Sequence, residues 1–299
     1  MTRTTIEQSF GPVRFLPGPN RGKYPHCHSV YVEGAGLLID PASDRERLIR
    51  LRDEEGVSMV WLSHWHEDHL AHLDLFPGVP VWVHERDAGP LSGVEAFLDA
   101  YGLPEAGPLR EFWRPVLRDQ FHFVPRVPDR ILQGGETISL GVTDVRVIHA
   151  PGHTPGNLAL YFEKPGVLFL ADYDLTPFGP WYGDLESSIE DTEKSVNLLA
   201  QIPAQAWLAS HETGVFTGDI PRLAREYLAV AGRREERLWE FLSQPRSLDD
   251  IVDQWIAYQK PREPREFFAY AEAALMGKHL ERLARLGRAR EESSRWMRA

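Results

Sequence analysis

Seven consecutive residues at positions 63–69, Ser-His-Trp-His-Glu-Asp-His, hold three histidines and two carboxylates. They directly follow an apolar run, residues 57–62, which predicts a buried strand. A polar cluster at the end of a buried strand restricts the fold, because the strand fixes where the imidazoles lie. A solvated loop that collected polar residues by chance is the plain alternative.

The spacing of the histidines favours a metal site over a solvated loop. Side chains alternate faces along a strand, so His64 and His66 are expected to point the same way while Trp65 points the other way. Asp68 and His69 follow on the turn. Four potential ligands therefore converge on one small volume.

Three later stretches offer further ligands, each just past an apolar strand. They are His153 in "VIHAPGHTPGN", Asp172 in "VLFLADYD" and His211 in "AWLASHETG". A single histidine at a strand end is more often a satisfied polar residue than a ligand. Together with the first motif, however, the three positions support one shared site.

The chain changes character near residue 218. Before it, strands alternate with helices, including a helix capped by Ser43 and closed by Gly56. The segment 90–130 is interpreted as an inserted helical or loop segment rich in aromatics. This alternation predicts an α/β sandwich with two sheets between helices. After it, amphipathic helices dominate. We expect a catalytic domain at 1–218 and a small helical module at 219–299.

The charge and composition of the chain argue against some kinds of binding protein. A net charge of −11 argues against a general nucleic-acid binder or a protein of anionic membranes. Cys27 is the only cysteine, so no intrachain disulfide forms; it lies far from the motifs in sequence, and we interpret it as a buried strand residue. No signal-like or membrane-spanning apolar run is present. We expect a soluble, cytoplasmic protein.

The order of the motifs resembles the metallo-β-lactamase fold superfamily over roughly residues 10–218. The motifs are H-x-H-x-D-H, then "PGHT", then a strand-ending Asp, then "SH". The resemblance implies an αββα sandwich with a dinuclear metal site at one edge. It also implies a ligand set: for the first metal His64, His66 and His153, for the second Asp68, His69 and His211, and as the bridge Asp172. Asp40 matches a position that orients a ligand histidine, although a turn residue before Pro41 is an equal alternative.

The implied activity is metal-dependent hydrolysis by a metal-bound hydroxide. Imidazole and carboxylate ligands suit two divalent ions, with Zn²⁺ preferred and Fe or Mn open. Asp68 would orient the hydroxide and shuttle its proton. Many relatives have a small residue and two glycines after the Asp-His pair, where this chain has "LAHL". His72 therefore enters the site or, as we prefer, is a helix residue.

Two substrate classes remain open. The first is a small-molecule thioester, ester or lactone. The alternative is a phosphodiester, which would make the protein an endoribonuclease or phosphodiesterase, but the long insertion typical of RNA-processing members between Asp172 and His211 is absent. A homodimer is compatible with the sequence.

Aromatic residues after Asp172 predict a substrate pocket. Phe178, Trp181 and Tyr182 lie on a loop stiffened by proline and glycine, and they either form the pocket wall or anchor the loop in the core. A weaker prediction is that aromatics of the inserted segment cover the same pocket; these are Phe112, Trp113, Phe121 and Phe123.

The C-terminal module resembles the small winged-helix-like tail of some hydrolases of this superfamily. From Lys278 onward, seven basic residues stand against three acidic ones, so the tail is locally positive. RNA binding by this tail is one interpretation. Because the whole chain is acidic, we prefer the interpretation that the tail packs beside the active site.

Overall fold

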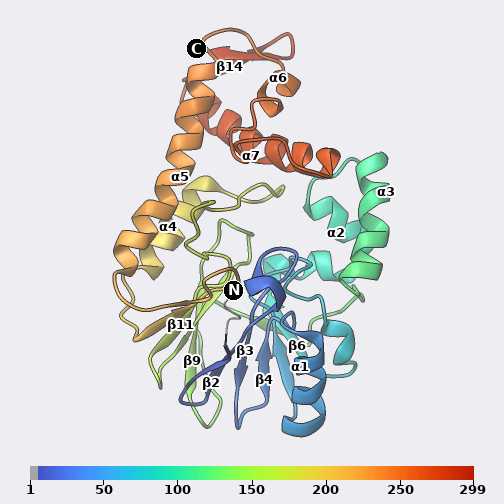
Figure 1. The fold of residues 1–299 in the computed structure, drawn as a ribbon, viewed down its shortest axis with the longest axis vertical. Helices are drawn as coiled ribbons and strands as arrows, with labels where there is room; N and C mark the ends of the chain where they lie inside the picture. Colours follow the sequence, from blue (N-terminus) through green and yellow to red (C-terminus); the bar gives the residue numbers. More distant parts are fainter. Residues whose placement is uncertain (1–5) are drawn as a thin grey trace.

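The computed structural model describes residues 6–299, which form two β-sheets with helices around them and a helical module at the C-terminus (Figure 1). The first sheet has seven strands in sequence order. They are β1 (Gln8–Phe10), β2 (Val13–Leu16), β3 (Ser29–Val32), β4 (Leu37–Ile39), β5 (Met59–Trp61), β6 (Val81–His84) and β7 (Arg130–Leu132).

The second sheet has six strands in the order β13-β12-β11-β10-β9-β8. They are β8 (Thr137–Ser139), β9 (Asp144–His149), β10 (Leu158–Phe162), β11 (Val167–Phe169), β12 (Ala206–Leu208) and β13 (Val215–Phe216). Two sheets flanked by helices confirm the predicted α/β sandwich.

Parallel pairing aligns the strand ends that carry the polar motifs. In the first sheet β4, β5, β6 and β7 are parallel neighbours, and in the second β11 runs parallel to β12. Parallel strands present their carboxyl ends at the same edge. The residues after β11 and β12 therefore emerge at one edge of the second sheet, and the residues after β5 emerge beside the ends of β4 and β6 in the first sheet.

Helices pack outside the sheets and around the strand ends (Figure 1). They are α1 (Arg45–Arg50), α2 (Val94–Ala100), α3 (Pro108–Pro115), α4 (Ile189–Leu199), α5 (Ile220–Phe241), α6 (Leu248–Val252) and α7 (Arg265–Arg285). The residue that caps α1 is Asp44, whose carboxylate accepts from the Arg47 amide at 2.8 Å, and not Ser43 as predicted. Both residues are good caps, and the sequence does not separate neighbours of that kind.

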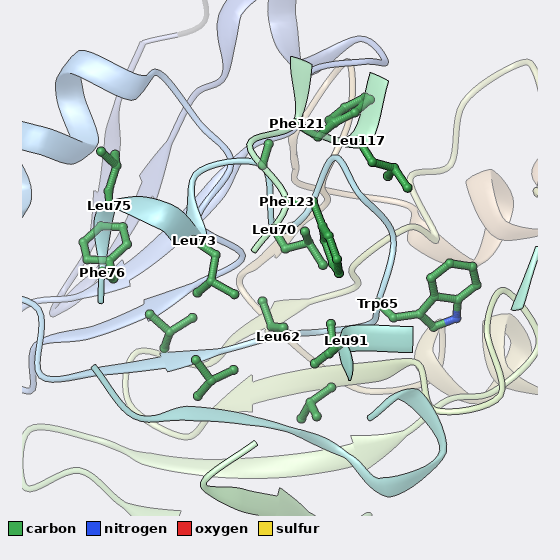
Figure 2. Packing of buried hydrophobic residues seen from close by; sticks show 14 of the residues in the cluster. Leu62, Trp65, Leu70, Leu73, Leu75, Phe76, Leu91, Leu117, Phe121 and Phe123 are labelled. Carbon is green, nitrogen blue, oxygen red and sulfur yellow. The ribbon is translucent and has the colours of Figure 1, made fainter. Parts of the chain in front are cut away.

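Two aromatic residues that were predicted to cover the pocket are instead buried in the core between the first sheet and its helices. Phe121 and Phe123 are 1% and 7% exposed and pack among leucines and Trp65, as Figure 2 shows. That prediction is wrong for these two residues, because α3 and the turn after it fold back onto the core. Phe112 is 42% exposed, and Trp113 is buried.

The C-terminal module consists of α5, α6, α7 and the hairpin of β14 (Ala289–Glu292) with β15 (Arg295–Arg298). A capping box formed by Ser247 and Asp250 starts α6. Leu238, Ile251 and Leu275 belong to the module's own apolar core. The winged-helix description and the boundary at residue 218 stay predictions.

No helix within residues 6–299 is both long and apolar enough to cross a bilayer. The cellular compartment stays a prediction.

Candidate metal centre

Three imidazole nitrogens from two distant segments converge on one point. His64 Nε2 lies 3.1 Å from His66 Nδ1, and His153 Nε2 lies 3.1 Å from the first and 2.9 Å from the second. Asp172 Oδ2 lies 3.3 Å from His153 Nε2. A tetrahedral zinc ion with bonds of 2.0–2.1 Å to nitrogen separates its ligand atoms by roughly 3.3 Å. These four side chains therefore have the spacing of a metal site.

The loop after β5 presents two of these histidines. The strand itself ends at Trp61, so the predicted alternation along a strand is not what directs the side chains. Ser63 instead fixes the loop, since its amide and hydroxyl donate to the Asp40 carboxylate at 2.7 and 2.6 Å. His64 and His66 face the centre, and Trp65 packs in the core.

A tight turn between β9 and β10 presents His153. Gly152 has φ 133°, and a Cβ there would lie 2.2 Å from a backbone nitrogen of α4, so the position requires glycine. The buried carboxylate of Asp87 accepts from the Thr154 hydroxyl and the Gly156 amide, both at 2.6 Å. Burial raises the pKa of Asp87 to about 7. The sequence analysis missed Asp87, because nothing near it in the sequence indicates this contact.

A second group of ligands lies on the other side of Asp172. His69 Nε2 is 2.8 Å from Asp172 Oδ1, and His211 Nε2 is 3.3 Å from Asp172 Oδ2. Asp68 lies 3.5 Å from His211 and 3.9 Å from His69. The structure thus brings all seven predicted ligand residues together, with Asp172 between the two groups.

The polar atoms of the centre are arranged as ligands of a cation. Asp172 Oδ1 is buried yet has no hydrogen-bond partner, since the contact to His69 lacks hydrogen-bond geometry. Three ring nitrogens that face one another also cannot all be satisfied by protons among themselves. A cation in each group satisfies these atoms, because imidazole and carboxylate are ligands that Zn²⁺ accepts.

Asp40 lies behind the second group. Its Oδ2 accepts from His69 Nδ1 at 3.0 Å, and both atoms are fully buried. The bond fixes the ring so that Nε2 faces Asp172. Asp40 therefore has the geometry of an orienting residue in addition to its place before Pro41.

Asp184 was missed by the sequence analysis. Its Oδ2 accepts from His66 Nε2 at 2.8 Å, and its Oδ1 accepts from Trp181 Nε1 at 3.0 Å. Burial alone would lower the pKa of His66. The negative charge and the hydrogen bond of Asp184 have the larger combined effect and raise that pKa to about 9. The bond leaves His66 Nδ1 facing the other histidines. No motif marks Asp184, which is 118 positions from its partner.

We expect Asp184→Asn to weaken metal binding by about 10- to 100-fold, the usual cost of losing a partner behind a ligand histidine. Competition with a chromophoric chelator measures this affinity. The matched control is Glu186→Gln, an exposed acid on the same loop whose ion-pair partner among residues 6–299 is Arg86. Unchanged affinity in Asp184→Asn would show that the carboxylate does not orient His66.

The aromatic loop after Asp172 is mainly an anchor. Tyr182 is fully buried, and its hydroxyl bonds His279 Nε2 at 2.8 Å. Phe178 packs against the core of the C-terminal module, and Arg234 lies 4.6 Å from its ring centroid. The pocket prediction is wrong for Tyr182 and disfavoured for Phe178, because helices far along the chain cover them. Trp181 is partly buried beside Asp184, and its pocket role stays a prediction.

Cys27 and His72 are the two remaining residues whose positions relative to the centre were open. Cys27 is fully buried as predicted but precedes β3, and its Sγ lies 3.8 Å from both ring nitrogens of His69, so it is near the motifs in space although far from them in sequence. His72 lies outside the centre, in a group with Asp74 and His122. The Arg45 guanidinium bonds Asp74 at 2.6 and 2.8 Å, so a cation already occupies that carboxylate.

The sequence is similar to those of known hydrolases. The profile of the Metallo-beta-lactamase superfamily matches residues 23–211. Acyl-coenzyme A thioesterase MBLAC2 of Gallus gallus is 28% identical over 207 residues, which cover 68% of this chain and 70% of that protein. Hydroxyacylglutathione hydrolase of Gloeobacter violaceus is 28% identical over 188 residues, covering 59% of this chain and 58% of that one.

The fold is similar to solved structures over almost the whole chain. A metallo-beta-lactamase family protein from Thermus thermophilus has a TM-score of 0.72 and 25% identity, covering 96% of this chain and 99% of that one. A beta-lactamase domain protein from Burkholderia ambifaria has a TM-score of 0.69 at 21% identity, covering 100% and 95%, which shows the fold alone. The matched profile includes every histidine and aspartate of the two ligand groups. The chain belongs to the metallo-beta-lactamase superfamily and has the metal-site architecture of a hydrolase.

Proposed function

We propose that this protein is a dinuclear metal-dependent hydrolase of a small-molecule thioester, ester or lactone. The observation that carries the proposal is the position of Asp172, whose two oxygens lie within 3.3 Å of His69, His153 and His211. A carboxylate between two groups of imidazoles is suited to bridging two cations. Zn²⁺ is the preferred ion, with Fe and Mn as alternatives.

In the proposed reaction, some residues would hold the cations and another would orient the attacking water. His64, His66 and His153 would hold one cation, and His69, His211 and Asp68 the other, with Asp172 shared. When bound, the cations supply Lewis acidity to polarise the scissile carbonyl and to activate water. Asp68, which is 4% exposed, would orient the attacking water and accept its proton at a carboxylate oxygen.

An aromatic layer leads outward from the centre. The Tyr101 ring stacks on the His66 ring, and the Trp113 ring stacks on Tyr101, with 5.6 Å between the ring centroids in each pair. Phe267 of α7 packs against Trp113 at 5.5 Å and against Tyr24 at 6.4 Å. Trp113 is buried, so an apolar acyl group would contact the exposed Tyr24 and the partly exposed Tyr101 and Phe267, where burial contributes roughly 25 cal/mol per Å². The relatives are named for acyl-coenzyme A and hydroxyacylglutathione, both acyl thioesters, so a thioester is our first choice.

The phosphodiester alternative has weaker support. Arg282 contacts Glu193 at 2.9 Å, and Arg285 pairs with Glu190. Arg288 lies 3.9 Å from Glu235. Acidic partners on α4 and α5 therefore accompany the basic residues of the tail, which supports packing of the tail and disfavours RNA binding through it.

A turnover panel tests the proposal. Metal-loaded protein would be assayed with acyl-CoA thioesters, hydroxyacylglutathione, lactones, bis-p-nitrophenyl phosphate and single-stranded RNA. We expect kcat/KM to be highest for a thioester and to vanish after chelation. Faster turnover of RNA or of the phosphodiester would reverse our ranking.

A further inference from the structure

The second ligand group contains a sulfur atom. Cys27 Sγ, one ring nitrogen of His69 and one of His211 all lie within 4.8 Å of one another, and all three side chains are buried. Sγ is 3.8 Å from His69 Nε2. Tetrahedral zinc, with bonds near 2.3 Å to sulfur and 2.0–2.1 Å to nitrogen, separates the two ligand atoms by roughly 3.6 Å. The observed distance is close to this spacing, and Sγ lies equally far from His69 Nδ1, so the Cys27 side chain would have to rotate toward Nε2 to share its metal.

The backbone holds Cys27 in this place from both sides. The amide of His28 donates to the Ser210 carbonyl at 2.8 Å. His211 Nδ1 donates to the His26 carbonyl at 3.0 Å. The segment that carries the thiol is thus tied to the strand end that carries His211, although more than 180 positions separate them.

Gly18 permits the close packing around this segment. A Cβ at Gly18 would lie 2.0 Å from the Cys27 carbonyl oxygen, so only glycine fits. The chain on either side of Cys27 therefore has little room to move the sulfur away from the centre.

We propose that Cys27 is an additional, thiolate ligand of the second metal position, beside the ligands proposed above for that position. The inference rests on the proposed dinuclear centre and extends it. In the metal-free chain the thiol donates to the His28 carbonyl at 3.1 Å. Binding of the cation replaces the S–H bond by a metal–sulfur bond, and the proton leaves to solvent.

A thiolate makes the two metal positions chemically different. The first group offers three imidazoles and a carboxylate, without sulfur. Soft thiolate ligands favour zinc over the harder Mn²⁺. The second position therefore selects zinc more strongly than the first. An inert buried cysteine, the common alternative, is usually surrounded by apolar atoms, whereas this one faces two imidazoles.

Cobalt substitution of the full chain tests the inference independently of turnover. Cys27 is the only cysteine, so a thiolate-to-cobalt charge-transfer band in the near ultraviolet has a single possible source. We expect the band in wild-type protein loaded with two equivalents of Co²⁺. In Cys27→Ser it is expected to disappear while the visible ligand-field bands of cobalt remain.

The outcomes separate this inference from the proposed function. Two bound cobalt ions without the band would overturn the sulfur ligand and leave the dinuclear centre intact. One cobalt at saturation without the band would overturn both. X-ray absorption of wild-type zinc protein needs no variant: a sulfur shell at about 2.3 Å supports the inference, and its absence refutes it.

Discussion

Asp172→Ala is expected to lower kcat/KM for the best substrate by about a thousandfold or more, and to reduce the metal content per chain below that of the wild-type protein. Asp172 lies between both ligand groups, so its loss removes a ligand from each. A thousandfold loss corresponds to about 4 kcal/mol of transition-state stabilisation, within the several kcal/mol that a metal supplies as a Lewis acid. Elemental analysis and steady-state kinetics measure the two effects.

The control for this variant is Asp53→Ala, an exposed aspartate that, within the part of the chain that the structure describes, pairs with the neighbouring Arg52. It removes the same side chain far from the centre and should leave both quantities unchanged. If Asp172→Ala retains two metals and wild-type turnover, the bridging role is wrong. The Asp172→Ala protein also measures contaminating hydrolase activity in the substrate panel.

The convergence of the histidines and aspartates at one centre was predictable because their signal is local. His64, His153, Asp172 and His211 each follow an apolar strand, and a strand end is visible in the sequence as a change from apolar to polar residues. In the second sheet, parallel pairing aligns the ends of β11 and β12, and two successive antiparallel pairings make β9 point the same way as β11. The same local pattern accounts for the correct prediction of the two-sheet sandwich.

The supporting residues were not predictable because their partners are distant. Asp184 and His66 are 118 positions apart, Asp87 and Gly156 are 69 apart, and Cys27 and His69 are 42 apart. An isolated acid or cysteine in a loop has no periodicity that indicates its partner. Only the folded chain shows which of them reach the centre.

The pocket prediction for the aromatic loop after Asp172 was inaccurate for a related reason. Proline and glycine correctly indicated a stiff loop next to Asp172, but the direction of each ring depends on what covers it. Helices α5 and α7 cover Tyr182 and Phe178. Since these helices lie in the C-terminal module, which the sequence did not place relative to the loop, the orientation of the rings was open.

Arg234→Ala is expected to destabilise the protein by about 2–4 kcal/mol, because it leaves two buried carbonyls without a donor. Arg234, on α5, is 3% exposed. Its guanidinium donates to the carbonyls of Phe178 at 2.7 Å and Pro180 at 2.9 Å, and to the Tyr182 hydroxyl at 3.2 Å. Denaturant unfolding of the full chain measures the change.

The adjacent Arg233 is the matched control. It is exposed on the same helix, so Arg233→Ala should change the free energy of unfolding by no more than about 0.5 kcal/mol. Equal stability of Arg234→Ala and Arg233→Ala would mean that the loop does not depend on the guanidinium.

The same substitution tests whether the C-terminal module shapes the metal centre. Arg234 holds the loop that carries Trp181 and Asp184, and Asp184 orients His66. If the guanidinium acts on metal affinity through Asp184, the loss in Arg234→Ala and the loss in Asp184→Asn are one effect, and the double variant binds metal about as weakly as Asp184→Asn alone. Additive losses would indicate two independent routes. A non-additive result would make the module part of the site's architecture, since a residue of α5 would then set the orientation of a histidine on the loop after β5.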